Sequence, residues 1–317
     1  MITTDLSLAI KALNDHKIIA LPTETVYGLA GNAFSETAIA SIFSLKQRPL
    51  YNPLIVHIKS AEFLPQVARE MPEIALILAK EFWPGPLTLV LKKQSIIPDL
   101  VTAGKDTVAV RVPNHPMALA LLNKLDFPLA APSANPFGSI SPTTAEHVAN
   151  YFSEGLNVIL NGGTCARGIE STIIGFENNQ PVVYRLGSLS IEQIENKIGK
   201  LHANTHADNA PKAPGMLSRH YAPSTPMHLT DEVENLVQTF FNKKIGVLVF
   251  KNPVPEITLA HQEILSPSGN LKEAAKNLYA AMHRLDKLNL DLIVAERLPD
   301  KDIGKTLNDK LERATKK

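Results

Sequence analysis

Positively charged side chains gather where an apolar helical pattern ends. Lys46 and Arg48 close that pattern, and Pro49 and Pro53 then fix the direction of the chain. Cations near a helix C-terminus also offset the helix dipole, so a purely structural role is the alternative. Two cations on a rigid loop suit a polyphosphate better than a helix stop, and the sequence therefore favours phosphate binding here.

A second candidate, Arg111, lies in an otherwise apolar strand pattern over residues 106–113. Alternation in a strand puts three valines on one face and Thr107, Ala109 and Arg111 on the other. A partly buried guanidinium needs an anionic partner. We therefore expect Arg111 to hold a ligand carboxylate or phosphate in a bidentate way.

Two further loops concentrate polar groups after strand patterns. Residues 21–34 carry two threonines, a tyrosine and two glycines, and the carboxyl end of a strand is where open α/β sheets bind ligands. Residues 129–147 place Ser133, Asn135, Ser139 and Ser141 among stiffening prolines. A capped turn and an extended solvent loop are the structural alternatives, but loops this polar and rigid favour ligand binding.

Several common catalytic signatures are absent from the sequence. There is no G-x-G-x-x-G, no G-x-S-x-G and no H-E-x-x-H string. The single cysteine, Cys165, excludes an intramolecular disulfide and a site of several cysteines, and it suits a reducing compartment. Arg167 nearby could lower the pKa of this thiol, but a tolerated loop cysteine is the favoured interpretation.

Composition narrows the class of protein further. The 317 residues include 32 Lys+Arg and 31 Asp+Glu, so the net charge is close to zero. This charge argues against a protein that binds many phosphates along a nucleic acid. The first residues lack the cationic region of a signal peptide, and the longest uncharged stretch, residues 127–145, contains four prolines. We therefore expect a cytoplasmic protein without a membrane helix and with a small-molecule site.

Alternating strand and helix patterns must position these loops. Strands are expected at residues 18–21, 54–58, 87–91, 107–112, 128–131, 158–160, 171–176 and 182–186. Helices are expected near the N-terminus and at residues 35–46, 72–82, 116–125, 144–152 and 191–198. A second α/β unit is expected from strands at 245–250 and 290–295 and a helix at 271–285. This pattern predicts a first domain over residues 1–199, a proline-rich linker over 200–226 and a smaller C-terminal α/β domain over 227–317.

Several strings, in this order and spacing, resemble the YrdC-like family: LPTETVYGLAG, LKQRP with NPLIVH, WPGPLTLVL, DTVAVRVP, APSAN with SPT, GIESTII and YRLG. The linker string APGMLSRHYAP and the C-terminal unit look like the long form of that family. This resemblance implies a twisted sheet of mixed parallel and antiparallel strands with a concave pocket, followed by a Rossmann-like domain. It also implies an L-threonylcarbamoyladenylate synthase, a nucleotidyltransferase that forms L-threonylcarbamoyl-AMP and pyrophosphate from L-threonine, bicarbonate and ATP.

The resemblance also implies roles for individual residues. The family's K-x-R and S-x-N pattern falls on Lys46, Arg48, Ser133 and Asn135 as catalytic positions. Threonine-binding positions fall on Thr25, His57, Arg111, Ala131 and Ser171. ATP-binding positions fall on Arg48, Asn52, Thr107, Ser133, Ser141 and Arg185, and on Tyr221 as the linker residue that closes over the nucleotide. His57 stays open between a general base and a hydrogen-bonding partner of the substrate.

Partners follow from the same resemblance. Mg²⁺ would accompany ATP, and the product would pass to a transferase that modifies adenosine 37 of tRNA, as the first step of threonylcarbamoyladenosine synthesis. Direct binding of nucleic acid is expected to be weak or absent. One alternative is a non-catalytic RNA-binding module of the same fold, against which the balanced charge argues. Another is a carbamoyl-adenylate enzyme of the hydrogenase-maturation type, which normally carries zinc-finger cysteines that one cysteine cannot supply.

Overall fold

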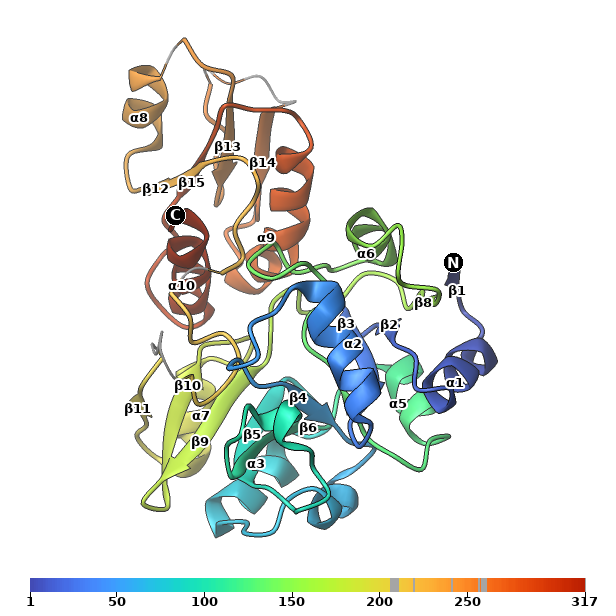
Figure 1. The fold of residues 1–317 in the computed structure, drawn as a ribbon. Coiled ribbons are helices and arrows are strands. Elements are labelled where there is room, and N and C mark those ends of the chain that lie inside the picture. The colour runs from blue at the N-terminus through green and yellow to red at the C-terminus, as the bar shows by residue number, and fades with distance from the viewer. Residues whose placement is uncertain (206–210, 219, 241, 256, 258–260, 317) are drawn as a thin grey trace.

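Two α/β domains and the linker between them make up the protein (Figure 1). The computed structural model describes residues 1–205, 211–218, 220–240, 242–255, 257 and 261–316. The first domain contains a large sheet of mixed parallel and antiparallel strands, and the second contains a smaller parallel sheet. This architecture confirms the fold class that the sequence predicts.

The strand order of the large sheet, β1-β8-β2-β3-β7-β4-β6-β5-β9-β10-β11, differs strongly from the order in the chain. β4 and β6 run parallel with His57 opposite Arg111, and β7 pairs antiparallel with β4 so that Leu129 also faces His57. Chain segments that are far apart in sequence therefore end at one place. The strands are β1 (Ile2–Thr3), β2 (Ile19–Leu21), β3 (Gly28–Asn32), β4 (Ile55–His57), β5 (Leu87–Lys92), β6 (Thr107–Arg111), β7 (Leu129–Ala130), β8 (Ile159–Leu160), β9 (Thr172–Glu177), β10 (Gln180–Arg185) and β11 (His202–Ala203).

Helices cover both faces of this sheet and bury its apolar residues. The helices are α1 (Leu6–Asn14), α2 (Glu36–Lys46), the 3₁₀ helix η1 (Ala61–Gln66), α3 (Glu73–Phe82), α4 (Asp99–Thr102), α5 (Pro116–Leu122), α6 (Ala145–Tyr151) and α7 (Ile191–Ile198). The valines of β6 lie in the core with α2 and α3, as the alternation predicts. The Ser35 side chain caps α2, and Ser190 and Gln193 form the predicted capping box of α7.

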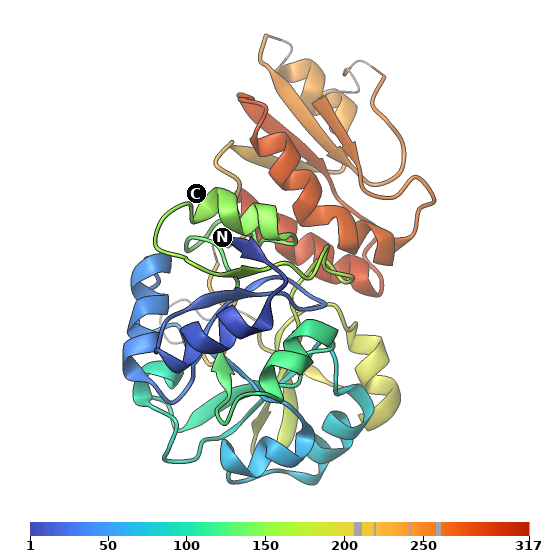
Figure 2. The same cartoon turned by 90° about the vertical axis from the view of Figure 1, so that its right-hand side faces the viewer.

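The C-terminal domain has a parallel sheet in the order β12-β15-β13-β14. Its elements are β12 (Met227–Thr230), α8 (Val233–Thr239), β13 (Ile245–Val249), β14 (Gln262–Ile264), α9 (Leu271–Asp286), β15 (Leu292–Glu296) and α10 (Ile303–Thr315). Figures 1 and 2 both place α9 and α10 on the side of the first domain and α8 on the far side. Among the described residues, the protein has no helix with the length and apolar character that crossing a membrane requires.

The linker is packed against both domains. Ala213 and Met216 are buried on the sheet face that carries Ile55 and Ala109. Tyr221 belongs to a second apolar cluster that also contains residues of α9 and α10. Because one core includes residues of both domains, the C-terminal domain and the linker are fixed against the first domain in this structure.

The structure also corrects the expected secondary structure. Residues 28–32 form the strand β3, although their two glycines suggest a loop. A Cβ on Gly31 would approach Ala38 and Ile18 to 3.2 Å, so the small residue lets this strand pass closely under α2. The short strands β1, β11 and β14 and the elements β12, α8 and α10 are not predicted by the sequence patterns.

Candidate active site

A pocket lies between the large sheet and the linker. Its walls come from the turn after β2, the end of α2, the ends of β4, β6 and β10, the loop after β7, and four linker residues, Pro214, Gly215, His220 and Tyr221. Nine of the residues predicted for the site line this pocket: Thr25, Arg48, His57, Arg111, Ala131, Ser133, Ser171, Arg185 and Tyr221. The fold therefore brings together side chains from positions 25 to 221.

Local geometry explains how the first two of these side chains reach the pocket. In the turn after β2, the Thr23 hydroxyl donates to the Val26 carbonyl at 2.6 Å and accepts from the Thr25 amide at 3.2 Å. This turn holds Thr25 at the carboxyl end of β2. At the end of α2, Gln47 adopts a left-handed conformation with φ of 53°, which reverses the chain and directs Arg48 to the pocket.

Arg111 has a protein carboxylate as its partner. Its Nη2 lies 2.7 Å from Oε1 of Glu24, its Nη1 donates to the Thr25 hydroxyl at 2.9 Å, and its Nε donates to the Gly85 carbonyl at 3.1 Å. The sequence predicts a ligand anion at Arg111 and gives no indication of Glu24. The structure adds Glu24 as an ion-pair partner of the guanidinium, and the expected ligand anion at Arg111 stays a prediction.

Arg48 and Arg185 form the cationic part of the pocket. Arg48 donates to the carbonyls of Asn52 and Pro53, and Arg185 donates to the carbonyl and hydroxyl of Ser171. Burial, and then the charge of Arg185, lower the pKa of Arg48 to about 9. Neither guanidinium has a carboxylate within ion-pair distance among the described residues. Two neighbouring buried cations without an ion-pair partner among the described residues favour a polyanionic ligand.

Lys46 lies outside the pocket, beneath the loop that follows β7. Its ammonium donates to the carbonyls of Ser133 (2.6 Å) and Asn135, and burial, followed by the charge of Arg48, holds its pKa well below the usual value. In this structure Lys46 connects the end of α2 to the loop that follows β7. For Lys46 to contact a phosphate directly, its hydrogen bonds to these two carbonyls would have to break.

The other predicted polar residues occupy the surroundings of the pocket. Both polar side-chain atoms of Asn52 and the Oδ1 atom of Asn135 are buried without a hydrogen-bond partner among the described residues, which marks positions that a ligand or water would complete. The Ser141 hydroxyl donates to Glu170 at 2.6 Å. Thr107 begins β6, roughly 13 Å along the strand from Arg111. The structure does not bring Thr107 to the pocket.

Two histidines line the pocket in their neutral form. Burial, and then the charge of Arg111, lower the pKa of His57 to about 3, and its Nδ1 is buried without a partner among the described residues. Burial and four nearby cations lower the pKa of His220 well below its usual value. An imidazole with so low a pKa is a weak base at neutral pH. The low pKa therefore favours the hydrogen-bonding role for His57, and the assignment of this role stays a prediction.

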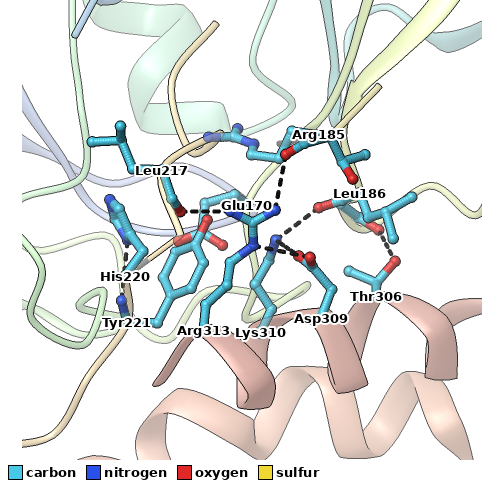
Figure 3. Close-up of polar contacts among 12 residues, drawn as sticks. Glu170, Arg185, Leu186, Leu217, His220, Tyr221, Thr306, Asp309, Lys310 and Arg313 are labelled. Carbon is cyan, nitrogen blue, oxygen red and sulfur yellow. Dashed lines mark hydrogen bonds and ion pairs between the residues drawn. The ribbon is translucent and has the colours of Figure 1, made fainter. Parts of the chain in front are cut away.

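The linker wall of the pocket rests on the C-terminal domain (Figure 3). The Tyr221 ring stacks on Tyr279 of α9 with centroids 5.7 Å apart, and the Lys310 ammonium of α10 lies 4.9 Å from the Tyr221 ring centroid. Arg313 of α10 donates to the Leu217 carbonyl of the linker at 2.6 Å. Tyr221 is 1% exposed and lines the pocket, and its hydroxyl is buried without a hydrogen-bond partner among the described residues.

Lys310 also reaches the end of β10. Its ammonium donates to the Leu186 carbonyl at 2.8 Å, next to Arg185, and pairs with Asp309. Asp309 accepts from Arg313 as well, so one carboxylate serves two buried cations (Figure 3). Helix α10 therefore fixes both the linker and the strand that carries Arg185.

Sequence reasoning missed three important residues. Glu24 lies between two threonines in a loop that the sequence does single out, and His220 directly precedes Tyr221. Glu170 precedes Ser171 and is the only carboxylate among the described residues that line the pocket. It accepts hydrogen bonds from Ser141 and from the Tyr279 hydroxyl, at 2.6 and 2.8 Å. The last contact joins the pocket to the C-terminal domain, which no local sequence pattern indicates.

Cys165 is 2% exposed, and burial raises the pKa of its thiol. The lowering that Arg167 could have produced is therefore not found. A buried, protonated thiol is an inert core residue.

Comparison with known proteins gives matches over both domains. A family model described as "Telomere recombination" matches residues 11–187, and a model described as "Threonylcarbamoyl-AMP synthase, C-terminal domain" matches residues 189–315. The chain is 41% identical to the threonylcarbamoyl-AMP synthase of Pyrococcus abyssi, over 96% of this chain and 92% of that protein. It is 38% identical to that of Bacillus subtilis, over 95% of this chain and 90% of the relative.

Solved structures of the P. abyssi protein Sua5 have the same fold. Its complex with L-threonine matches with a TM-score of 0.91 and 40% identity, covering 98% of this chain and 94% of that one. A variant in which a histidine and the tyrosine after it are both replaced by alanine matches with a TM-score of 0.92 and 38% identity, covering 99% of this chain and 95% of that one.

Proposed function

Because the chain belongs to the threonylcarbamoyl-AMP synthase family, we propose that it converts L-threonine, bicarbonate and ATP into L-threonylcarbamoyl-AMP and pyrophosphate. The observation that carries this proposal is the convergence of Arg48, Arg111 and Arg185 in one pocket beneath the linker. One of these arginines is neutralised by Glu24 and two have no carboxylate partner among the described residues. The pocket thus has one part suited to an amino acid and one suited to a polyphosphate.

Threonine is proposed to bind at the Arg111 side. Its carboxylate would meet the Arg111 guanidinium, and neutral His57 and the hydroxyls of Thr25 and Ser171 are near enough to line the same space. Ala131, at the end of β7, would contribute backbone groups. Neutral hydrogen-bonding groups suit the hydroxyl and amine of threonine, because a buried polar group must find a partner.

ATP is proposed to bind at the side of the pocket that carries Arg48 and Arg185, where Ser133 also lines the pocket. The other predicted ATP-site residues, Asn52, Asn135 and Ser141, lie around the pocket without lining it. The threonine amine, in its deprotonated form, first combines with bicarbonate to give a carbamate and water. A carbamate oxygen then attacks the α-phosphorus while pyrophosphate leaves. This adenylyl transfer makes the protein a nucleotidyltransferase. It needs orientation and charge stabilisation rather than a protein nucleophile, and two uncompensated guanidinium groups can supply the charge.

Mg²⁺ is proposed to enter as part of the substrate MgATP. Among the residues that the structure describes, no group of three or more His, Cys, Asp or Glu side chains is placed to hold a metal. A cation of this type commonly keeps several waters and binds through substrate phosphates.

The His220–Tyr221 pair is proposed to close over the nucleotide. It is the only His-Tyr pair in the sequence, and the matched P. abyssi variant replaces such a pair by alanine. Both side chains line the pocket from the linker. We further propose that the product passes to a transferase that modifies tRNA, since the near-neutral chain lacks the charge for extensive nucleic-acid binding.

Pyrophosphate release tests the proposed reaction. We expect release from ATP only when L-threonine and bicarbonate are both present, and without any tRNA. Release that is unchanged after bicarbonate has been stripped from the buffer would overturn the proposal. Lysine in place of threonine serves as the control, because its side chain lacks the hydroxyl that the neutral hydrogen-bonding groups on the Arg111 side would meet.

A further inference from the structure

The ion pair between Arg111 and Glu24 is built into the wall of the pocket. Arg111 lines the pocket, whereas Glu24 lies behind it and is 6% exposed. Oε1 of Glu24 contacts the guanidinium, and Oε2 accepts the backbone N–H of Asn114 at 3.1 Å. Because Oε1 forms an ion pair and Oε2 accepts a hydrogen bond, the negative charge is held in place when a ligand arrives.

Arg111 nevertheless keeps hydrogen-bonding capacity for a ligand. A guanidinium has five N–H donors. Gly85 and Thr25 take one donor each, and Nη2 contacts Glu24 as an ion pair without forming a hydrogen bond, so donors remain for a ligand. A ligand carboxylate can therefore bind Arg111, but it must do so with Glu24 on the same guanidinium.

This arrangement places two carboxylates around one cation. A ligand that carries only a carboxylate would add an uncompensated negative charge beside Glu24, and like charges at close range are strongly unfavourable. A ligand that carries an α-ammonium next to its carboxylate brings its own positive charge and avoids this repulsion. The pocket's other two guanidinium groups, on Arg48 and Arg185, have no such carboxylate partner among the described residues.

We propose that Glu24 is a specificity-determining residue, which makes the Arg111 side of the pocket select a zwitterionic α-amino acid over a simple carboxylic acid. This inference rests on the proposed function, because it assumes that threonine binds at Arg111. Glu24 does not line the pocket, so it acts through the charge and the orientation of Arg111. Discrimination by repulsion of the wrong ligand is a general route to specificity.

Binding of two ligands to the purified full-length protein tests the proposal. L-threonine is compared by calorimetry with (R)-3-hydroxybutanoate, which has the same carbon skeleton and hydroxyl but no amine. The ratio of their dissociation constants is measured in wild type and in Glu24→Gln. We expect removal of the negative charge to reduce the preference for threonine by about tenfold or more, because the repulsion of the lone carboxylate is lost.

Two variants control for indirect effects. Glu263→Gln breaks an Arg–Glu pair with Arg284 in the C-terminal domain, and it should leave the preference at the wild-type value. Glu24→Asp keeps the charge but withdraws it by one methylene, and it should reduce the preference less than Glu24→Gln does. Should Glu24→Gln not fold, Glu24→Asp alone decides, and a preference equal to that of wild type overturns the inference.

The outcomes separate the inference from the function on which it rests. If wild type does not bind threonine, the proposed function fails. If wild type binds threonine and Glu24→Gln keeps the wild-type preference, the role of Glu24 is wrong while the proposed function stands. If wild type binds 3-hydroxybutanoate nearly as tightly as threonine, no selection exists and the inference is again overturned.

Discussion

The Tyr221 hydroxyl is buried without a hydrogen-bond partner among the described residues, and this makes Tyr221→Phe an informative substitution. A buried hydroxyl that has lost its water costs roughly 1–3 kcal/mol of stability. The stacking on Tyr279 and the contact with Lys310 involve the ring and survive in phenylalanine. We therefore expect the ligand-free variant to be more stable than wild type, by about 1 kcal/mol at the low end of this range.

The same change should weaken nucleotide binding. If the free hydroxyl bonds a charged phosphate of ATP, its loss costs roughly 1.5–3 kcal/mol of binding free energy. This range corresponds to an increase of about tenfold or more in the dissociation constant of ATP. Without ATP, Tyr221→Phe should thus be more stable than wild type, and ATP should stabilise it less than it stabilises wild type.

Thermal unfolding with and without MgATP measures both effects. One kcal/mol corresponds to a rise of about 2 °C in Tm for a chain of this size. Tyr27→Phe is the matched control, because the Tyr27 hydroxyl is also buried but donates to Gly163 and accepts from Gly162. It should lower Tm. If the Tm of Tyr221→Phe lies below that of wild type, the free hydroxyl does not destabilise the ligand-free protein. If MgATP raises the Tm of the variant as much as that of wild type, the hydroxyl does not bind ATP.

Three further predictions follow from the charges in and around the pocket. Arg111→Ala should raise the threonine KM far more than the ATP KM. Arg48→Ala should lower kcat by roughly 10²-fold, because the guanidinium that stabilises charge in the transition state is lost. Steady-state kinetics with each substrate varied would show the reverse pattern if the roles are misassigned. Arg313→Ala removes the hydrogen bond that α10 donates to the Leu217 carbonyl, so the linker should loosen and the ATP KM should rise at least about tenfold. An unchanged ATP KM would show that α10 does not hold the linker in place for ATP binding. The free energy of unfolding should fall as pH drops from about 6.5 to about 4, because His57, with a pKa of about 3, stays neutral in the fold while the unfolded chain takes up a proton. Urea titrations at several pH values check this last prediction, and a flat profile would count against buried neutral imidazoles.

Sequence patterns predicted the parts of the fold that depend on local periodicity. The valines of β6 alternate with Ala109 and Arg111, and this period placed Arg111 on the face opposite the core. Ser35 and Ser190 marked helix starts because their side chains cap the first turn. β3 was missed because its glycines, needed for close packing under α2, have the composition of a turn.

The site could be predicted only where function depends on the side chain itself. Cations and hydroxyls such as Arg48, Arg111 and Ser133 stand out from their neighbours, and the family resemblance implies the other positions. Nine of the predicted residues line one pocket. Glu24 and Glu170 were missed because their importance lies in partners from distant segments, Arg111 and Tyr279. Pairing across 87 and 109 positions depends on strand order and on domain docking, and no local pattern contains that information.

Helix α10 illustrates the same limit. Lys310 and Arg313 would be read on a sequence as exposed charges of an amphipathic helix, but each is 1% exposed. They are buried because carbonyls of the linker and of the β10 end accept their hydrogen bonds. Only the docked domains bring these acceptors within reach.

The reaction proposed for this pocket joins the carbon of bicarbonate to threonine and activates the product with ATP. Incubation with isotopically labelled bicarbonate, L-threonine and MgATP, followed by mass spectrometry of the nucleotide products, follows this carbon directly. We expect labelled threonylcarbamoyl-AMP in wild type and its loss in Arg48→Ala. An unlabelled threonyl adenylate, or AMP without any threonine adduct, would show that the protein does not catalyse this reaction.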